Sequence, residues 1–523
     1  MPGYLIHHAV SHWAERAPDA PALIMEGRSL SWSELEEAGN RLAHALLARG
    51  LAPGDRVGIF MHKSLHLGVA LYGILKAGGA FVPLDPFLPP ARLEVVLEDC
   101  GIRHLVASDT VARTLESLPP AARPSIYGLD PRDGLDGVSW AEVDTHPAHP
   151  PDLRLIDLDL GYIMYTSGST GRPKGMMHTH RGSLTYARWG ADHVGLGPGD
   201  RVASHAPLHF DLSIFDFFST AQAGAAVVLV PEGVTKFPAS FTRTIESEGI
   251  SVVFTVPFTL IEMLERGALD QRDLSSLRWI LFGGEPFPPK HLRALMARLP
   301  GVRFTNVYGP AEAPSCTCYD VPPLAEGDDA PIPIGTMSRN SRGLIIDADD
   351  QECPVGVPGE LCVRSSTLTL GYWNRPELNA RVFLERPSHG PRPEVWYRTG
   401  DMVSRGEDGL LHFHGRRDRM VKTRGHRVEL DEVEAALCTH PAVSEAAAFA
   451  VPDGQGSSAI LATVTLREGD DPDGGEIMRH IRGHLPVYAL PREVTVASDL
   501  PRTTSGKVDR GRLRDLYLDG RRP

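Results

Sequence analysis

Short apolar runs alternate with segments of helical periodicity along most of the chain. Residues 57–60, 80–84 and 160–164 are apolar runs of strand length, and between them apolar residues recur every three or four positions. The same alternation continues over residues 182–283. Because alternating strands and helices usually form a parallel sheet covered on both faces, we predict an α/β fold with two related lobes. Residues 331–413, which are rich in proline and glycine, are predicted to be more β-rich.

The N-terminal segment is predicted to contain a tight hairpin followed by a helix. Residues 22–25 and 30–32 are short strand-like runs that flank a Gly-Arg turn. Ser33 is followed three residues later by Glu36, and apolar positions then recur at helical spacing. We therefore expect Ser33 to cap this helix.

The length and net charge of the chain exclude several classes of protein. A chain of 523 residues is too long for one hydrophobic core, so roughly two to four compact units are expected. The formal net charge of −13 argues against a general nucleic-acid or membrane-surface binder. The six cysteines lack the paired spacing of a zinc site or a disulfide framework, and no apolar run is long enough to span a membrane. We expect a cytoplasmic protein that acts on small molecules.

A loop rich in glycine, serine and threonine follows the predicted strand at residues 160–164. Its sequence, Tyr165-Thr-Ser-Gly-Ser-Thr-Gly-Arg-Pro-Lys-Gly175, offers many backbone N–H groups and hydroxyls to an anion. Lys174 is followed by glycine rather than by serine or threonine, so the loop is not the P-loop of nucleotide hydrolases. Taken alone, such a cluster is most often a polar surface turn.

Further loops carry charged residues close to predicted strands, and open α/β sheets bind ligands at strand ends. Asp211 follows a predicted strand and is flanked by apolar residues, a setting in which aspartate usually caps a helix. Asp401 lies in a Thr-Gly-Asp sequence that alone would indicate only a turn. A basic run begins at Arg416, but its interleaved acids and the acidic net charge argue against a nucleic-acid patch. The full loop sequences are His209-Phe-Asp-Leu-Ser-Ile-Phe215, Gly283-Gly-Glu285, Asn306-Val-Tyr-Gly-Pro-Ala-Glu312, Tyr397-Arg-Thr-Gly-Asp401, Gly415-Arg-Arg-Asp-Arg-Met-Val-Lys-Thr-Arg-Gly-His-Arg-Val-Glu-Leu430 and Leu500-Pro-Arg-Thr-Thr-Ser-Gly-Lys-Val-Asp-Arg510.

In sequence and in order, these motifs resemble those of the adenylate-forming superfamily, which includes acyl-CoA synthetases, luciferases and the amino-acid adenylation domains of peptide synthetases. The resemblance covers residues 13–510. It implies a large N-terminal domain (residues 1–415) of two α/β lobes plus a β-rich part, and a small mobile α+β C-terminal domain (residues 416–523). ATP, Mg²⁺ and an amino acid would bind between the two domains. Because no condensation or carrier motif flanks the core, a freestanding enzyme is expected.

The resemblance implies that the glycine-rich loop and several strand-end loops bind the nucleotide. Tyr308 would stack on adenine, and Asp401 with Arg416 would bind the ribose. Glu312 would bind Mg²⁺ and take part in catalysis together with Thr166. The residues implied to bind the nucleotide are Thr166, Ser167, Gly168, Ser169, Thr170, Gly171, Lys174, Gly284, Glu285, Asn306, Tyr308, Gly309, Asp401 and Arg416.

One position departs from the family pattern. The family has threonine where this chain has Ala311, so a hydroxyl that would contact the α-phosphate and the substrate carboxylate is missing. Loss of one such donor elsewhere costs on the order of 3 kcal/mol in the reaction barrier. Another group or a water must supply that contact, and altered kinetics are expected.

The resemblance also implies a pocket for an amino acid. Asp211 would hold the substrate ammonium, because a carboxylate in an apolar pocket forms a strong charge-assisted hydrogen bond with a cation. The residues implied to line the pocket are Asp211, Leu212, Phe215, Thr255, Leu281, Gly283, Val307, Ser315 and Cys316, with Lys507 at its mouth. Only Asp211 and Lys507 in this set carry a fixed charge, and Phe215 and Leu281 are bulky. A small neutral amino acid is therefore expected, alanine first and then glycine, serine or proline.

Three residues of the C-terminal domain are given roles by the resemblance. Lys507 would be the catalytic lysine, because a compact charge on a long stem can reach both the substrate carboxylate and the α-phosphate. Asp418 would be the hinge, and Gly425 would let a phosphopantetheine arm pass close to the backbone. Rotation about Asp418 would exchange the Lys507 region for the Gly425 region at the site.

The implied reaction is ATP-dependent formation of an aminoacyl-AMP, followed by transfer of the aminoacyl group to a separate acyl or peptidyl carrier protein. Such a reaction serves nonribosomal peptide or polyketide biosynthesis. The alternatives are an acyl- or aryl-CoA ligase, which Asp211 disfavours, a ligase acting on a carrier-bound amine, and activation of proline or a β-amino acid. A non-catalytic nucleotide-binding homologue is a further alternative, for which Ala311 is the only hint. Neither a nucleic acid nor a membrane is expected as a partner.

Overall fold

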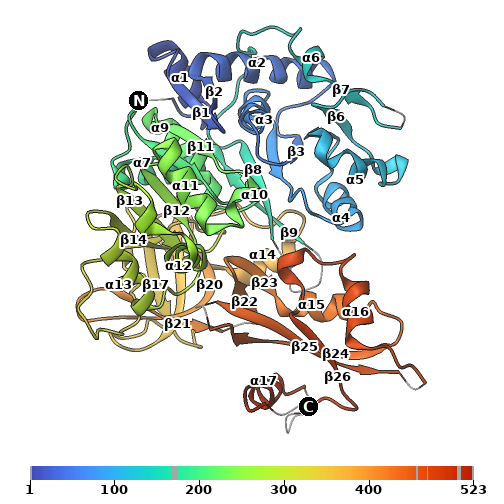
Figure 1. Cartoon of the computed structure of the whole chain (residues 1–523), viewed down its shortest axis with the longest axis vertical. Helices are drawn as coiled ribbons and strands as arrows, with labels where there is room; N and C mark the ends of the chain where they lie inside the picture. Colours follow the sequence, from blue (N-terminus) through green and yellow to red (C-terminus); the bar gives the residue numbers. More distant parts are fainter. Residues whose placement is uncertain are drawn as a thin grey trace.

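The computed structural model describes residues 3–132, 134–166, 173–417, 419–454, 457–467, 469–502 and 508–520. In Figure 1 the two N-terminal lobes are blue and green, the β-rich part is yellow to orange, and the C-terminal part is red. The predicted α/β class is confirmed, with sheets flanked by helices in the large part and a smaller C-terminal part.

The first lobe is built on a sheet whose strands run in the order β7-β6-β5-β3-β4-β8-β9. Its strands pair in parallel, except that β8 and β9 at one edge form an antiparallel pair. The strands are β3 (Arg56–Phe60), β4 (Ala80–Pro83), β5 (His104–Ala107), β6 (Ser125–Tyr127), β7 (Gly137–Val138), β8 (Leu160–Thr166) and β9 (Lys174–Thr179). The helices of this part are α2 (Trp32–Ala48), α3 (Leu65–Lys76), α4 (Pro90–Cys100), α5 (Ala112–Glu116) and α6 (Trp140–Val143).

The second lobe has the strand order β16-β15-β14-β13-β12-β10-β11-β1-β2, so the N-terminal hairpin completes the sheet of the green lobe. Its strands are β1 (Pro21–Met25), β2 (Arg28–Ser31), β10 (Arg201–Ser204), β11 (Ala226–Leu229), β12 (Val252–Thr255), β13 (Trp279–Gly283), β14 (Arg303–Tyr308), β15 (Thr317–Asp320) and β16 (Thr336–Met337). Its helices are α1 (His8–Arg16), α7 (His180–Val194), α8 (Leu212–Ile214), a π-helical turn (Phe215–Ser219), α9 (Thr220–Ala223), α10 (Glu232–Thr235), α11 (Pro238–Glu248), α12 (Pro257–Arg266) and α13 (Pro289–Arg298).

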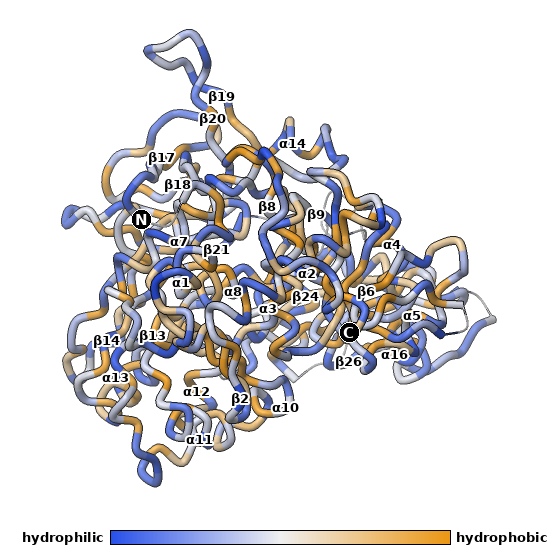
Figure 2. Tube along the Cα trace, turned by 90° about the horizontal axis from the view of Figure 1, so that it is seen from above, coloured by the Kyte–Doolittle hydropathy of each residue, from blue (hydrophilic) through white to orange (hydrophobic). Residues whose placement is uncertain are grey.

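The β-rich part follows β16, as the proline- and glycine-rich composition predicted. Its sheet has the order β17-β18-β20-β19, and β21 pairs with β20. The elements are β17 (Ser341–Ile346), β18 (Gly359–Ser365), α14 (Pro376–Val382), β19 (Phe383–Arg386), β20 (Glu394–Arg405) and β21 (Leu411–Arg416). Figure 2 shows the mostly hydrophilic connection between β19 and β20 projecting from the body of the molecule.

The C-terminal part has its own small sheets. The hairpin of β22 (Met420–Thr423) and β23 (His426–Glu429) forms a two-stranded sheet, and β24, β25 and β26 form another. The remaining elements are α15 (Leu430–Leu437), β24 (Val443–Pro452), β25 (Ser458–Leu466), α16 (Gly474–Ile481), β26 (Glu493–Val496) and α17 (Arg510–Leu518). A separate apolar core lies between α15, α16 and the sheet. Asp418, the predicted hinge, lies outside the described residues, and the boundary at residue 415 stays a prediction.

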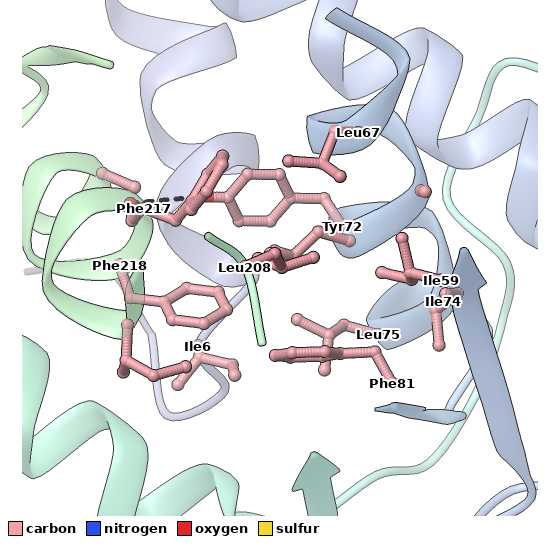
Figure 3. Packing of buried hydrophobic residues seen from close by; sticks show 14 of the residues in the cluster. Ile6, Ile59, Leu67, Tyr72, Ile74, Leu75, Phe81, Leu208, Phe217 and Phe218 are labelled. Carbon is pink, nitrogen blue, oxygen red and sulfur yellow. Dashed lines mark hydrogen bonds between the residues drawn. The ribbon is translucent and has the colours of Figure 1, made fainter. Parts of the chain in front are cut away.

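The two N-terminal lobes share one apolar core. Figure 3 shows Tyr72 of α3 beside Phe217 and Phe218 of the second lobe, above Phe81 of the first. The Tyr72 hydroxyl donates to the carbonyl oxygen of Phe217 at 3.1 Å. This buried hydrogen bond satisfies a carbonyl in the π-helical turn, and it fixes one lobe against the other.

The cap of α2 differs from the prediction. Ser31, not Ser33, is the N-cap, and its hydroxyl accepts from the Glu34 N–H while Glu34 accepts from the Ser31 N–H. Ser33 instead donates to the Pro18 carbonyl. Both spacings fit a capping box, but β2 ends at Ser31 with an extended backbone, which is the conformation that an N-cap requires.

Within the described residues, no helix is both long enough and apolar enough to cross a membrane.

Candidate active site

A cavity of about 110 Å³ lies where the carboxyl ends of β8, β12, β13 and β14 meet the C-terminal hairpin β22–β23. Ligands bind at this edge of open α/β sheets because the loops after neighbouring strands converge there. The lining residues are Met164, Tyr165, Thr166, Tyr186, His209, Phe210, Asp211, Leu212, Phe254, Val256, Gly283, Gly284, Val307, Gly309, Pro310, Ala311, Pro314, Ser315, Asp401, Arg416, Met420, Lys422, Gly425, His426, Arg427 and Tyr488. Both domains therefore contribute walls.

Asp211 occupies the N-cap position of α8, but its side chain makes no capping hydrogen bond. The carboxylate instead borders the cavity. Burial raises the pKa of Asp211 to about 6, and the nearby Lys422 charge offsets part of that rise. Lys422 is a cavity residue from β22 that the motif comparison did not single out. A buried carboxyl with a raised pKa gains free energy from any cation that binds beside it.

Asp401 lies beside the two residues that were expected to share the nucleotide with it. The Tyr308 hydroxyl donates to Asp401 Oδ2 at 2.5 Å, and Arg416 Nη1 donates to Oδ1 at 2.6 Å. Asn306, by contrast, turns its amide to the Pro333 carbonyl at 2.8 Å. A ribose at Asp401 would have to share this carboxylate with Tyr308 and Arg416.

Glu312 is fully buried and bound by a residue of the C-terminal hairpin. Arg427 Nη1 lies 2.9 Å from Oε1 and 3.0 Å from Oε2, and the Tyr372 hydroxyl donates to Oε1. Burial alone would raise the pKa of Glu312, but Arg427 and Lys174 outweigh it and hold the pKa at about 2. The carboxylate is therefore ionised at neutral pH.

Lys174, at the end of the glycine-rich loop, faces the same hairpin. Its ammonium lies 3.5 Å from Glu429 Oε1 and 5.0 Å from the centroid of the Tyr372 ring. Burial and the Arg427 charge lower the pKa of Lys174. Ser167, Gly168, Ser169, Thr170 and Gly171 of the same loop lie outside the described residues.

The side chains at this site could hold Mg²⁺ only if phosphate oxygens of the substrate supplied further ligands. The described part of the chain holds no cluster of three or more His, Cys, Asp or Glu side chains that could bind a metal ion. Mg²⁺, however, is usually bound by one or two carboxylates with waters and substrate phosphates. Glu312 is such a carboxylate: it is ionised, pairs with Arg427 and directly follows the cavity residue Ala311 in the chain.

Thr166 offers an unpaired hydroxyl to the cavity that Ala311 also lines. Both residues line the cavity, and Thr166 Oγ1 is buried without a hydrogen-bond partner among the described residues. A buried hydroxyl left unpaired is costly. Thr166 is thus a group that could supply the contact missing at Ala311.

Five of the nine predicted pocket residues border the cavity, namely Asp211, Leu212, Gly283, Val307 and Ser315. Phe215, Leu281 and Cys316 are fully buried, and none of the three borders it. Thr255 faces a different cavity and contacts His205 Nδ1 at 3.2 Å. Successive side chains of a strand point to opposite faces, so Phe254 and Val256, on either side of Thr255, border the predicted pocket in its place. Tyr186 of α7 is a further wall residue that the motifs did not indicate.

A second cavity, of about 940 Å³, adjoins the first between the second lobe and the C-terminal part. The two share His209, Phe210, Leu212, Val256, His426 and Tyr488 as lining residues. The His426 ring stacks on Tyr488 with centroids 3.9 Å apart and meets Phe210 edge-on at 4.7 Å. These aromatic rings form the boundary between the two cavities.

Gly425 and Glu285 join the two domains beside that boundary. The Gly425 N–H donates to Glu285 Oε1 at 2.7 Å, and Ser457 Oγ donates to the same oxygen at 3.0 Å. Glu285 was expected to bind nucleotide, and here it binds the C-terminal part. Gly284 borders the cavity with a φ of +94°.

Lys507 lies outside the described residues. The flanking residues Arg502 and Val508 form an isolated bridge, and α17 packs on β24. In Figure 1, α17 lies at the far end of the C-terminal part from β22 and β23. The hairpin side of this part, rather than the α17 side, therefore faces the cavity.

Comparisons with known proteins agree with this architecture. The family described as AMP-binding enzyme matches residues 10–373, and the AMP-binding enzyme C-terminal domain matches residues 432–507. An L-proline--[L-prolyl-carrier protein] ligase of Pseudomonas fluorescens is 37% identical over 506 residues, covering 97% of this chain and 98% of that protein. A protein of the same name from Streptomyces coelicolor is 36% identical over 92% of this chain and 91% of its own length.

Solved structures have the same fold. The amide bond synthetase McbA from Marinactinospora thermotolerans superposes with a TM-score of 0.84 at 27% identity, covering 98% of this chain and 99% of that one. The two family matches fall one in the N-terminal part and one in the C-terminal part of the chain. The chain therefore belongs to the AMP-binding enzyme family and is an ATP-dependent, adenylate-forming ligase.

Proposed function

We propose that this enzyme activates a small neutral amino acid as its aminoacyl-AMP and transfers the aminoacyl group to the phosphopantetheine thiol of a carrier protein. The observation that carries the proposal is Asp211, whose uncapped carboxylate borders the cavity. An ammonium group would form a charge-assisted hydrogen bond with it, whereas a fatty or aryl acid has no cation to offer this carboxylate.

In the first half-reaction, a carboxylate oxygen of the amino acid attacks the α-phosphorus of ATP, and the bond to pyrophosphate breaks. Such a transfer depends mostly on positioning and on charge neutralisation. Lys174 and the hydroxyl of Thr166 would contact phosphate oxygens, and Asp401 would hold the ribose. Glu312 would hold Mg²⁺, which when bound neutralises phosphate charge. Lys507 would reach the reacting carboxylate, and this role stays a prediction.

In the second half-reaction, the arm would pass through the larger cavity and reach the adenylate beside Gly425. The thiol loses its proton to water, its sulfur attacks the aminoacyl carbonyl carbon, and the carbon–oxygen bond to the phosphate breaks, so that AMP leaves with the bonding electron pair. The roughly 940 Å³ of adjoining space between the domains supports this route. The hairpin brings Gly425 to the wall of the smaller cavity, which the larger one adjoins.

The walls favour a compact, uncharged side chain. Leu212, Phe254, Val256 and Val307 supply apolar surface, and an unpaired charged side chain among them would cost several kcal/mol. The sequence ranked alanine first. Because two relatives bear the name of L-prolyl-carrier protein ligases, we propose L-proline as the first substrate to test, ahead of alanine.

The acceptor is tested separately from the activated acid. Incubation with ATP, proline or alanine and a phosphopantetheinylated carrier should increase the carrier's intact mass by one aminoacyl group, and hydroxylamine should remove it. A carrier whose serine is unmodified is the matched control and should gain no mass. An amide product formed with a supplied amine, without carrier loading, would favour the amine-acceptor alternative, which the name of the McbA structure also suggests.

A further inference from the structure

An ion pair between two distant parts of the chain lies beside the ends of the glycine-rich loop. Arg375, at the N-cap of α14, places Nη2 2.7 Å from Oδ1 of Asp99, in the last turn of α4. The Trp373 indole N–H donates to the Asp99 carbonyl oxygen at 3.0 Å, and the Asn374 side-chain amide donates to the same oxygen at 3.4 Å. These contacts hold residues 373–375 against the end of α4.

Asp99 is electrostatically unfavourable at its position in α4. The C-terminal end of a helix carries partial negative charge, so a carboxylate in the last turn destabilises the helix unless a cation lies beside it. Arg375 supplies that cation, and Trp373 bonds a carbonyl of the last turn, where carbonyls lack partners within the helix. The contacts of this carboxylate outside α4, rather than the helix itself, therefore account for its presence.

The ion pair also binds one residue at each end of the glycine-rich loop. Its carboxylate accepts the Tyr165 hydroxyl through Oδ2 at 2.7 Å, and its guanidinium Nη2 lies 3.5 Å from the Pro173 carbonyl oxygen. The residues that directly follow these two in the chain are Thr166 and Lys174. Each of the two residues proposed to contact phosphate is therefore the neighbour of a residue bound to this ion pair.

The stretch of β8 and β9 that the ion pair binds lies beyond the parallel part of the sheet. Tyr162 of β8 pairs with Phe81 near the end of β4, and β8 continues beyond it to Thr166, paired with β9. Beside β9, the Trp373 N–H donates to the Gly175 carbonyl oxygen at 2.7 Å. Residues 373–375 and the ion pair thus fix the end of the β8–β9 hairpin to α4.

We propose that Asp99 and Arg375 are positioning residues for the phosphates of ATP, because their ion pair orients the two ends of the glycine-rich loop. This inference rests on the proposed contacts of Thr166 and Lys174 with phosphate. Among the described residues that line the two cavities, neither Asp99 nor Arg375 occurs. Both therefore act through the two loop-end residues that they bind.

Loss of the ion pair should affect function more than stability. The Arg375 and Asp99 side chains are 27% and 16% exposed, and partly exposed ion pairs contribute little to the free energy of unfolding. The orientation of the loop ends matters more, since a misplacement of about 1 Å can cost as much as about a hundredfold in rate. The use of ATP and pyrophosphate should therefore weaken, while the amino-acid pocket around Asp211 stays unchanged.

Pyrophosphate exchange by the full-length enzyme, with ATP and the amino acid titrated separately, tests the inference. Arg375→Met should raise the KM for ATP about tenfold, and the nearly isosteric Asp99→Asn about threefold, while the KM for the amino acid changes by less than about twofold. Calorimetry with Mg·pyrophosphate should give the same order of affinities without relying on turnover. The melting temperature of both variants should stay within about 3 °C of that of the unchanged enzyme.

Arg278→Met is the matched control. Arg278 pairs with Asp200 at 2.8 Å and also bonds two main-chain carbonyls, as Arg375 bonds one, but it lies at the amino ends of β10 and β13, away from the cavity edge. Removal of this partly exposed pair should leave both KM values unchanged.

Lys174→Met tests the phosphate contact on which the inference rests, and it should raise the KM for ATP more than Arg375→Met does. If Lys174→Met leaves ATP binding unchanged, the proposed phosphate site is wrong, and the inference with it. If Lys174→Met weakens ATP binding but Arg375→Met behaves as Arg278→Met does, the positioning role alone is overturned. An equal rise in both KM values in Arg375→Met would also overturn that role, because a general disturbance of the site would then explain the loss.

Discussion

The Gly425 N–H donates to the Glu285 carboxylate at 2.7 Å, and this contact joins the C-terminal hairpin to the loop after β13. Gly425 has a φ of +82°, and a Cβ at this position would lie 2.6 Å from Val256 Cγ1. The hairpin can therefore approach this closely only because residue 425 has no side chain.

Gly425→Ala should impair transfer while sparing adenylation. The added methyl group collides with Val256 in the docked state, so carrier loading should fall about tenfold, equivalent to ~1.4 kcal/mol. Amino-acid-dependent pyrophosphate exchange should change by less than about twofold, because it does not need the docked hairpin. Gly409→Ala is the matched control, since Gly409 has a φ of +80° with no atom within 4 Å of the added Cβ. Carrier loading by Gly425→Ala at the rate of the Gly409→Ala enzyme would show that the arm goes elsewhere.

Binding of the amino acid should weaken as the pH falls below about 6. Burial raises the pKa of Asp211 to about 6, so below that pH the carboxyl is protonated and loses its attraction for an ammonium group. The dissociation constant of the amino acid should rise up to about tenfold for each pH unit below the pKa. Titration calorimetry at pH 5, 6, 7 and 8 checks this. Asp211→Asn should bind weakly at every pH with a flat profile, and a flat profile in the unchanged enzyme would refute the assignment.

Lys507→Ala should separate the half-reactions in the opposite sense. If Lys507 neutralises charge only during adenylate formation, exchange should fall at least about a hundredfold, and transfer from supplied aminoacyl-AMP should stay within about threefold. Lys290→Ala, which removes an exposed lysine from α13, should leave both rates unchanged. Equal loss in both half-reactions would reject the role given to Lys507.

The cap of α2 gives a test of stability. Ser31→Ala removes the hydroxyl that accepts from the Glu34 N–H and should lower the free energy of unfolding by ~1 kcal/mol. Ser33→Ala loses one exposed hydrogen bond to the Pro18 carbonyl and should cost about half as much. Denaturant titration of the two variants compares the two candidate caps directly. A larger loss for Ser33→Ala would reverse the assignment made from the structure.

Motifs at strand ends were predictable because the fold brings the carboxyl ends of neighbouring strands to one edge. Asp211 and Tyr308 are far apart in sequence, yet both lie at this edge, and Asp401, inside β20 of the β-rich part, meets Tyr308 there. The sequence did not show on which face of the sheet the Thr255 side chain lies, because an error of one residue in aligning a strand moves every side chain to the opposite face. Contacts between the domains could not be predicted from the sequence either. Arg427 meets Glu312 only because of where the C-terminal hairpin lies against the N-terminal domain.

The alternation of charge on β23 was the one available signal for those contacts. Arg427 and Glu429 stand two positions apart in a strand of otherwise ordinary composition, which predicts two opposite charges on one face. Their partners could not be named, because Lys174 begins β9 of the first lobe and Glu312 lies in the loop between β14 and β15 of the second.

The central claim, that this enzyme activates a small neutral amino acid through Asp211, is tested most directly by pyrophosphate exchange across proteinogenic amino acids, fatty acids and aryl acids. Proline or alanine should support exchange at least about tenfold faster than any charged or large aromatic amino acid, because each poorly accommodated group costs ~1–3 kcal/mol. Asp211→Asn should silence all amino acids alike, whereas Ser315→Ala, at another cavity position, should retain exchange. Exchange driven by a fatty acid, an aryl acid or a charged amino acid in preference to proline and alanine would contradict the claim.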